Sequence, residues 1–326
     1  MSKNITIAGA SYADVPAITV PSTAGGTAKF VDVSDTTATA ADVATGKQFY
    51  GADGGLVIGT ASGGGGSGGA GDCLTMGGAV LDDSAFTGTG KTLYDIPDTI
   101  EKIESSAITA IAAYAGERKS PFRDKLTSLI LNNVTEIGDS GLARRSLLAN
   151  CLMPLLTKIG RNAFYDCNKL IPTMPSLAET GEYAFQYCFS KGPAGIYQFD
   201  NLASPGKHTF DHAFKSGDTL KLPALKYLVS SLVYSSEVSL VDIGSTVETA
   251  VAGSLSLDNP NANVILRTPT PPVWVNTSTV GDLIRFNGYQ ATGHIYVPDD
   301  AVEAYKTAPG WSRTADRFLP LSAFPG

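Results

Sequence analysis

The sequence predicts a mainly β protein with short helices, built as a solenoid of stacked coils. A nine-residue phrase occurs twice, 21 positions apart, as Ile159-Gly-Arg-Asn-Ala163-Phe164-Tyr-Asp-Cys167 and Thr180-Gly-Glu-Tyr-Ala184-Phe185-Gln-Tyr-Cys188. Glycine is frequent, with 35 residues, and charged residues are few, at 17%. A period in the low twenties is too short for a two-helix repeat, and it suits one strand and one turn-like return in each coil.

Degraded copies of the phrase extend the repeat in both directions. The anchor residues then fall at 103, 137, 159, 180, 209 and 228, and we interpret the long first step of 34 residues as a missing copy or an insertion. One coil alone buries little, so the anchor, the Ala and the Phe should stack on their equivalents. The final Cys is expected to be a small buried residue of the same ladder. The degraded copies are Ile103-Glu-Ser-Ser-Ala107-Ile108, Ile137-Gly-Asp-Ser-Gly141-Leu142, Thr209-Phe-Asp-His-Ala213-Phe214 and Leu228-Val-Ser-Ser-Leu232-Val233.

The phrase I-G-x-x-A-F-x-x-C, followed by Leu170, Pro175 and Leu177, resembles the BspA-type leucine-rich repeat. The resemblance covers residues 100–326, although the stretch after Cys188 departs from it with Gly192-Pro193. It implies a leucine-rich-repeat solenoid that acts as a binding scaffold. Scaffolds of this class bind many different ligands, so the resemblance is informative for fold and weak for function.

Composition narrows the possible partners. The net charge is -7, the sequence pI is about 5.0 and no Lys/Arg cluster occurs, which disfavours nucleic acid and anionic membranes as partners. No apolar run approaches the roughly 18 to 20 residues of a membrane-spanning helix, so we expect no membrane insertion. The N-terminus has no adequate hydrophobic segment of a signal peptide, and we therefore expect synthesis in a bacterial cytoplasm.

Residues 1–60 are predicted to form a separate β-rich module. Alternating apolar residues indicate short strands, and Thr39 with Asp42 followed by Gly46 indicates a short helix. The expected strands contain Ile5 and Ile7, Ile18 and Val20, Val31 and Val33, and the residue pair Phe49-Tyr50 that precedes a turn and Leu56-Val57-Ile58.

The same segment, through ITIAGASYADVPAITVP and GGTAKFVDVSDTTATAADVATGKQFYGADG, resembles the N-terminal region of virion-associated proteins from phages and prophages of gut Firmicutes. This resemblance implies attachment to a tail or another part of a virion, and it does not follow from periodicity. A generic β module of an extracellular protein is the alternative. The Gly/Ser-rich run at 61–72 is expected to be a hinge between this module and the repeats.

The repeats are predicted over residues 73–268 and a capping unit over residues 269–326. Pro269, Pro271 and Pro272 are expected to end the ladder, because proline lacks the N–H that a ladder needs. The cap resembles the segment that follows BspA-type repeats, and open solenoids require one. Its expected parts are a strand at Ile295-Tyr-Val297, a short helix capped by Asp300 with Glu303, Val302 and Tyr305 facing the repeats, and bulky cover from Trp311, Phe318 and Leu321.

The four cysteines, Cys73, Cys151, Cys167 and Cys188, are interpreted as thiols and not as two disulfides. Cys167 and Cys188 occupy the same position of the repeat, and no two cysteines have C-x-x-C spacing. In a reducing cytoplasm, thiols are also kept reduced, so disulfides are rare.

No catalytic or metal-binding constellation is predicted. Residues 85–92 approach a phosphate-binding loop, but Asp82 and Asp83 precede them and Pro97 follows, so the required strand and helix are missing. His208 and His212 have the spacing of a shared metal site on a helix, yet no third ligand is evident. His294 starts a cap strand, which suggests a structural role. The pairs Asp82-Asp83 and Asp299-Asp300 suit turns and caps, because the two carboxylates of a glycosidase must face each other across a cleft and neighbours in sequence usually do not.

We therefore expect a non-enzymatic virion protein of the tail-fibre or tail-tip type that binds a host-surface glycan or protein and has no cofactor. Analogy with other phage fibres suggests a homotrimer. The alternatives are a structural decoration or head-fibre protein of the virion and a bacterial surface adhesin. If the repeats bind a receptor, the exposed x positions of the phrase should line up in rows across the coils. The weak candidates are Tyr165, Asp166, Gln186 and Tyr187, with Lys215 and Ser216 as their expected counterparts in the next coil.

Overall fold

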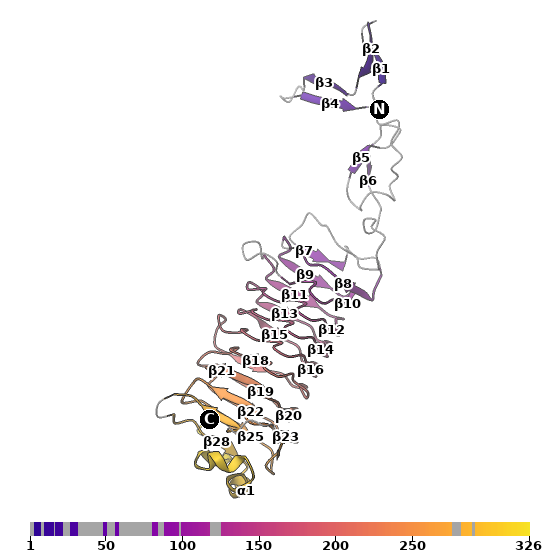
Figure 1. The fold of residues 1–326 in the computed structure, drawn as a ribbon. Helices are drawn as coiled ribbons and strands as arrows, with labels where there is room; N and C mark the ends of the chain where they lie inside the picture. Colours follow the sequence, from indigo (N-terminus) through magenta and orange to yellow (C-terminus); the bar gives the residue numbers. More distant parts are fainter. Residues whose placement is uncertain are drawn as a thin grey trace. The chain divides into compact units, whose positions relative to one another are not determined.

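The computed structural model describes residues 82–83, 88–97, 99–117, 125–275, 282–288 and 291–326, and it gives the main chain of the strands that precede them. The chain divides into two compact units, Met1–Ala70 and Gly71–Gly326. Figure 1 follows the strands of both units along the sequence. None of the helices in the described part of the chain is long and apolar enough to span a membrane.

The first unit contains three two-stranded antiparallel sheets. The strands agree with the predicted ones at Ile5, Ile18, Phe49 and Leu56, whereas the strand Ala10–Val15 was not predicted. The predicted helix between Thr39 and Gly46 and the predicted hinge at 61–72 lie outside the described residues. The pairs are β1 (Lys3–Ile7) with β2 (Ala10–Val15), β3 (Ala17–Pro21) with β4 (Thr27–Val31), and β5 (Gln48–Tyr50) with β6 (Leu56–Ile58).

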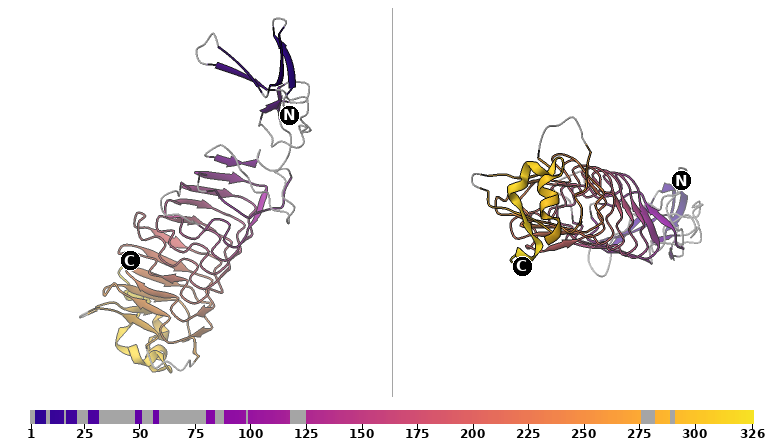
Figure 2. Two further views of the ribbon diagram at one scale, coloured as in Figure 1. Left: turned by 45° about the horizontal axis from the view of Figure 1, so that its top comes forward. Right: turned by 90° about the horizontal axis from the view of Figure 1, so that it is seen from below.

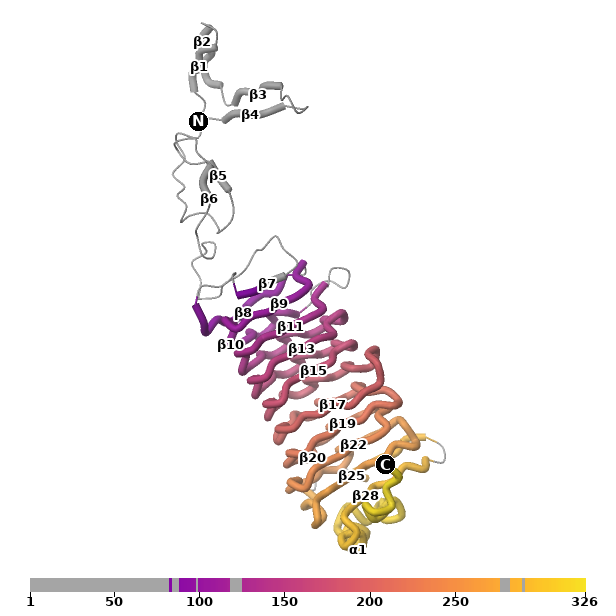
Figure 3. The backbone as a smooth tube through the Cα atoms, turned by 180° about the vertical axis from the view of Figure 1, so that it is seen from behind, coloured from indigo at the N-terminus to yellow at the C-terminus, as the bar shows by residue number. Residues whose placement is uncertain are grey.

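The second unit is a solenoid whose coils stack in parallel, as Figures 1 and 2 show. Each coil has a first face, a second face and a return face, and every strand pairs in parallel with its counterparts in adjacent coils. The first face is formed by two sheets that follow one another along the solenoid (Figure 3). Its strands are β7 (Val80–Asp82), β9 (Lys102–Ser105), β11 (Ser128–Leu131), β13 (Asn150–Leu152) and β15 (Ile171–Thr173), then β17 (Ile196–Gln198), β19 (Thr219–Leu222), β22 (Leu240–Ile243), β25 (Asn263–Leu266), β28 (Ile295–Val297) and β29 (Phe318–Pro320).

The second face carries the anchor residues, and the return face carries the A-F-x-x-C half of the phrase. A single parallel bridge, Glu179 to Ser204, continues the second face between its two sheets. The second face contains β8 (Lys91–Leu93), β10 (Ile108–Ile111), β12 (Glu136–Ile137), β14 (Lys158–Ile159) and β16 (Glu179–Thr180), then β20 (Tyr227–Leu228), β23 (Thr249–Ala250) and β26 (Val273–Trp274). The return face contains β18 (Phe210–Asp211), β21 (Val233–Ser236), β24 (Leu255–Leu257) and β27 (Ile284–Phe286).

Strand register confirms four of the predicted anchors and corrects the first. Ile137 pairs with Ile159, and Ile159 pairs with Thr180, while Leu228 lies on the same face. The residue before Ile137 in this row is Ile111, not Ile103. Ile103 pairs with Leu129 on the first face, so the step of 34 residues came from comparing two different faces of the solenoid.

The predicted anchor at Thr209 is also wrong, by four residues. The bridge between Glu179 and Ser204 makes Pro205 the counterpart of Thr180. The ring of Phe210, not that of Phe214, therefore continues the phenylalanine ladder: it stacks on Phe185 at 5.7 Å with an interplanar angle of 4°. With Pro205 as anchor, the rows of the return face are in register from coil to coil.

The interior is a ladder of identical or similar side chains, as the phrase predicts. Phe164 and Phe185 are fully buried, with ring centroids 5.4 Å apart. Cys151, Cys167 and Cys188 are buried thiols, whereas Cys73 lies outside the described residues. The mainly β solenoid with short helices is thus confirmed.

The final cysteine of the phrase also supplies a hydrogen-bond donor. The thiol of Cys188 donates to the carbonyl oxygen of Phe164 at 2.9 Å, and that of Cys167 donates to Leu142 at 3.2 Å. Ser236, two coils after Cys188, makes the equivalent bond with its hydroxyl to Phe210 at 3.2 Å. The position holds a small buried residue in every one of these coils, and the hydrogen bond is an addition where that residue is Cys or Ser, since Ala213 in the coil between Cys188 and Ser236 has no side-chain donor.

The ladder continues beyond the proline-rich segment, contrary to the prediction. Val264 pairs with Ile295 and Thr249 pairs with Val273, so Pro269, Pro271 and Pro272 lie in a connection and the faces resume after it. The last strand, β29, pairs with β28. The end of the solenoid is covered by η3 (Asp299–Ala301), α1 (Val302–Thr307), η4 (Trp311–Arg317) and η5 (Leu321–Ala323).

Three aromatic residues of the cap are fully or almost fully buried, as predicted. The indole N–H of Trp311 donates to the main-chain carbonyl of Pro272 at 3.0 Å. The hydroxyl of Tyr305 donates to the main-chain carbonyl of Thr268, also at 3.0 Å. Phe318 contacts both rings. Val302 packs against the core and Leu321 is half-buried.

The predicted cap by Asp300 is wrong. No side chain bonds the N-terminus of α1, because the 3-10 turn Asp299–Ala301 leads directly into the helix.

Candidate functional site

The return face carries two rows of side chains, one residue from each coil in each row, and all of these except Asp211 are at least partly exposed. Main-chain bonds fix their register: Asp166 N donates to the carbonyl of Gln186 at 2.9 Å, and Tyr187 N donates to that of Asp211 at 3.0 Å. The residue after each acceptor is therefore the equivalent of the donor in the next coil, so Tyr187 follows Asp166 and His212 follows Tyr187. One row is Tyr165, Gln186, Asp211 and Tyr234, and the other contains Asp166, Tyr187 and His212.

A third row, Asn162, Tyr183 and His208, lies at the corner where each coil enters the return face. Its members have φ values of 54°, 58° and 56°. Tyr187 and His212, in the second row, also have positive φ values of 58° and 50°. This left-handed conformation is uncommon for residues other than Gly, Asn and Asp and costs about 1–2 kcal/mol. Local backbone geometry favours Gly, Asn, Asp or His here, so the rings of Tyr183 and Tyr187 are disfavoured by the positions they occupy.

These rows bring six ring side chains together, and we call them the aromatic patch. Tyr183 and His208 stack with centroids 4.7 Å apart and an interplanar angle of 12°. Tyr187 contacts His212 at 4.9 Å, and its ring is 38% exposed, whereas Tyr234 is 42% exposed. Stacking rings of adjacent coils holds the side chains in fixed positions and leaves their edges and polar tips to the solvent. The aromatic patch consists of Tyr165, Tyr183, Tyr187, His208, His212 and Tyr234.

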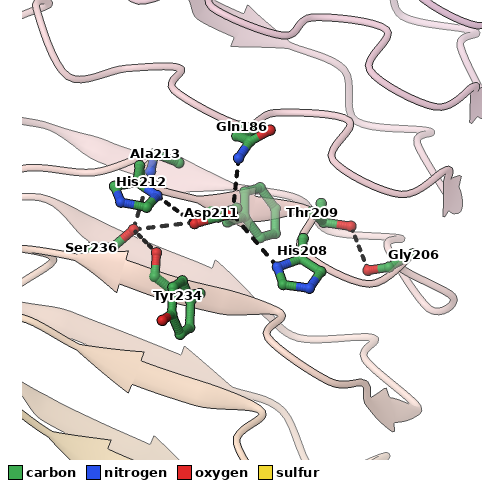
Figure 4. A network of polar contacts seen from close by, with 10 residues as sticks. Gln186, Gly206, His208, Thr209, Asp211, His212, Ala213, Tyr234 and Ser236 are labelled. Atoms are coloured by element: carbon green, nitrogen blue, oxygen red, sulfur yellow. Dashed lines mark hydrogen bonds and ion pairs between the residues drawn. The ribbon is translucent and has the colours of Figure 1, made fainter.

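Asp211 is the polar centre of the patch (Figure 4). Its side chain is buried, and one carboxylate oxygen lies 2.5 Å from Nδ1 of His212. The other oxygen accepts a bond from the amide of Gln186 at 2.9 Å and lies 3.5 Å from Nδ1 of His208. The carboxylate, which lies below the surface, thereby orients the imidazole of His212 and the amide of Gln186, whereas Nδ1 of His208 is buried and has no hydrogen-bond partner among the described residues.

Two arginines extend the patch towards the preceding coils. The guanidinium carbon of Arg161 lies 5.8 Å from the ring centroid of Tyr183, and that of Arg144 lies 5.9 Å from that of Tyr165. Cation–π contacts of this kind contribute about 0.5–1 kcal/mol at exposed positions. The patch therefore combines flat apolar area with hydrogen-bond donors of both neutral and cationic type.

The structure brings the four weakly predicted residues together. Tyr165 and Gln186 lie in one row and Asp166 and Tyr187 in the next, while Tyr165 and Tyr187 touch edge to face with centroids 5.7 Å apart. Their role in binding stays a prediction. Lys215 and Ser216, the expected continuation of these rows, are not part of them.

The residues that follow Gln186 and Tyr187 in these rows are Asp211 and His212, where the sequence had predicted Lys215 and Ser216. Lys215 instead lies in the turn before β19, where its main-chain N–H donates to Asp218 at 3.0 Å. The sequence prediction thus missed Asp211. It missed Tyr183 because it treated only two positions of the phrase as exposed, and it missed Tyr234 because it did not continue the first row into the coil anchored at Leu228. The glycine after the anchor, Gly206 here, is the signal that would have given the correct register.

The described residues contain no group of three His, Cys, Asp or Glu side chains placed to hold a metal. His208 and His212 lie on a return face and not on a helix. The aspartate pairs serve turns: Asp83 accepts a bond from the Ser105 hydroxyl at 2.6 Å, and this bond is the main cause that lowers the pKa of Asp83. The main-chain N–H of Ser322 donates to Asp299 at 3.0 Å.

One comparison, with a family of known repeats, agrees with the fold. Residues 122–192 match the family described as the BspA type leucine rich repeat region in six copies. The repeat region is a leucine-rich-repeat solenoid, and residues 122–192 of it are similar to the BspA type. The family match does not extend to residues 1–60 or to the cap, so the resemblances stated for those segments stay predictions.

Among solved structures, the crystal structure of a leucine-rich repeat protein from Bacteroides ovatus is similar, with 14% identity and a TM-score of 0.23, covering 77% of this chain and 94% of the other. At this TM-score the two backbones do not superpose closely, and the fold assignment rests on the strand register. Among curated proteins no relative matches.

Proposed function

We propose that this chain is a non-enzymatic binding protein whose return face contacts a ligand on a bacterial cell surface. The aromatic patch carries the proposal. Tyrosine gives a large contact area and one hydrogen bond at a low cost in side-chain entropy. Here four tyrosines and two histidines lie side by side, and two of the tyrosines occupy backbone positions that disfavour them.

A glycan or a protein of the host surface is the proposed partner, and the virion is the proposed location. The resemblance of residues 1–60 to virion-associated proteins supports attachment of the chain to a phage particle. Several copies per particle, three in a fibre-like homotrimer, would convert weak contacts into strong adhesion through avidity. A structural decoration protein and a bacterial surface adhesin are the two competing functions.

The role of the return face is tested by removing one exposed ring. In a cell-binding assay with fluorescent full-length protein and a panel of gut Firmicutes, Tyr234→Ser should weaken binding about tenfold, because central aromatic contacts contribute about 1–2 kcal/mol. Tyr227→Ser is the matched control, since Tyr227 is also a strand residue, is 37% exposed and lies on the second face. Equal binding by both variants would contradict a role for the return face.

The division of labour between the two ends is tested separately. Residues 73–326 should fold alone, bind cells and compete with phage adsorption, whereas residues 1–60 should be needed only for incorporation into particles. If the isolated repeats bind no host and particles without them adsorb normally, the decoration function replaces the adhesive one. If the repeats bind cells but residues 1–60 are dispensable for incorporation, the virion location fails and the surface adhesin is favoured.

A further inference from the structure

A second candidate site lies at the C-terminal end of the return face. An open cavity of about 370 Å³ is formed between β27 and η4. This volume is within the range of small-molecule sites, which is roughly 300–1,000 Å³. Its polar lining includes Arg285, Asn287, Arg313, Asp316 and Arg317.

Arg285 continues a row of the aromatic patch. Tyr234 pairs with Ser256, and Ser256 pairs with Arg285, so the same position of the coil changes from a phenol to a guanidinium at the last return strand. The cavity is nevertheless a separate feature, because Ser256 lies between the patch and Arg285. An inference about it stands whether or not the aromatic patch binds a ligand.

The three guanidinium groups differ in how they are held. Arg317 is fixed in place: its Nη1 donates to the carbonyls of Ala291 at 2.7 Å and Gly293 at 3.1 Å, and its guanidinium carbon lies 5.7 Å from the ring centroid of Phe286. Arg313 lies over the ring of Trp274 at 5.5 Å. Each of these two groups is therefore positioned by the protein before any ligand arrives.

Arg285 is exposed, and among the described residues its guanidinium forms no ion pair or hydrogen bond. Carboxylates neutralise the cavity only in part. Of Asp282 and Asp316, only Asp316 contacts a guanidinium, at 3.9 Å from Nε of Arg317, and its side chain is 80% exposed. Three arginines against two aspartates leave one formal positive charge, in a protein whose net charge is -7.

We propose that this cavity binds the carboxylate of an acidic sugar. A guanidinium binds a carboxylate with two parallel N–H···O bonds, and arginine is the side chain best suited to this geometry. A single surplus positive charge matches a monoanion, and Asp282 and Asp316 disfavour a dianion by like-charge repulsion. The amide of Asn287 and the hydroxyl of Thr314 are the hydrogen-bonding groups that a sugar hydroxyl requires.

Tryptophan fluorescence of the full-length protein reports on this cavity. The chain has two tryptophans, and Trp274 lies beside Arg313 at the cavity whereas Trp311 is fully buried. Titration with glucuronate should change the emission in a saturable way, while glucose and sodium chloride at equal ionic strength should not. Trp274→Phe should abolish the signal.

Arg285→Gln should weaken glucuronate binding about tenfold or more, because a hydrogen bond to a charged group is worth about 1.5–3 kcal/mol. The variant should fold normally, since Arg285 is exposed and no described residue forms a hydrogen bond or an ion pair with its guanidinium. Lys226→Gln is the control, because it changes the net charge equally at an exposed position on another face. Unchanged binding by Arg285→Gln would overturn the proposal.

Inorganic phosphate tests whether the cavity recognises a sugar or only charge. The proposal expects phosphate to bind at least tenfold more weakly than glucuronate near neutral pH. Phosphate binding that equals or exceeds glucuronate binding, or no saturable response to either anion, would overturn the sugar-carboxylate site. None of these outcomes depends on cell binding by the aromatic patch, so each failure is separable from a failure of the proposed function.

Discussion

Replacing Phe185 by Ala tests whether the phenylalanine ladder holds the coils together. The ring of Phe185 is fully buried and contacts four other rings. Phe164 and Phe210 stack on its two sides at 5.4 and 5.7 Å, and Phe189 and Phe199 lie at 5.6 and 5.3 Å. The substitution therefore removes the central member of an aromatic cluster and leaves a cavity between adjacent coils.

The expected cost is near the top of the range for large-to-small substitutions. Burying Ala where Phe was packed costs about 3–5 kcal/mol, and each aromatic pair adds about 0.5–1.5 kcal/mol beyond buried area. With four ring partners we expect about 5 kcal/mol. For a unit of this size, each kcal/mol lowers the melting temperature by about 2–4 °C, so the shift should be about 10–20 °C.

Circular dichroism melts measure the loss, and hydrogen exchange locates it. Because each coil contacts only its neighbours, faster exchange should concentrate at the amides of Phe164 and Phe210 and decline towards the cap. Tyr227→Ala, an exposed substitution, should stay within about 0.5 kcal/mol of the parent. A Phe185→Ala protein that melts with the parent would refute the ladder.

Three further predictions follow from buried groups. Burial raises the pKa of the Cys151 and Cys188 thiols, so these two and Cys167 should not react with Ellman's reagent in folded protein and should react in denaturant. Cys188→Ser should melt close to the parent, whereas Cys188→Ala should cost about 0.5–1.5 kcal/mol, because the Phe164 carbonyl loses one of its two donors and keeps the main-chain N–H of Cys167 at 3.1 Å; equal costs would contradict the hydrogen bond. Burial, then the nearby Asp218, raises the pKa of Tyr197 to about 12, so the unfolded chain ionises first and stability should fall from about pH 10 to 12; Tyr197→Phe should reduce this loss, and parallel pH profiles would contradict it.

Sequence periodicity predicted the solenoid and the core in the two coils that carry the full phrase. There the Phe and Cys positions are fixed by packing, so their residue types are strongly restricted. The anchor is less restricted: Thr180 is tolerated because its hydroxyl lies 2.9 Å from that of Thr209, and Pro205 is buried in the next coil. Searching for an apolar anchor therefore misplaced the register after Thr180.

The glycine after the anchor would have given the repeat register more reliably than the anchor itself. A Cβ atom on Gly181 would lie 2.4 Å from the nitrogen of Arg161, and one on Gly206 would lie 2.4 Å from the carbonyl carbon of Gly181. Successive coils touch backbone to backbone there, and only glycine fits. The rings of the return face were missed for a different reason: their left-handed positions normally hold Gly or Asn, so no propensity predicts Tyr183 or Tyr187 there.

The parallel, in-register stacking of the coils has a consequence for the reach of the return face. Adjacent strands lie about 4.8 Å apart, so a whole coil is the smallest unit by which the surface lengthens or shortens without a break in register. Gain or loss of one repeat between Tyr234 and Arg285, such as the coil that carries Ser256, would move the arginine cavity relative to the aromatic patch by one such step while each local structure stayed intact. The number of coils between the aromatic patch and the arginine cavity would thus set the length that a ligand needs in order to contact both.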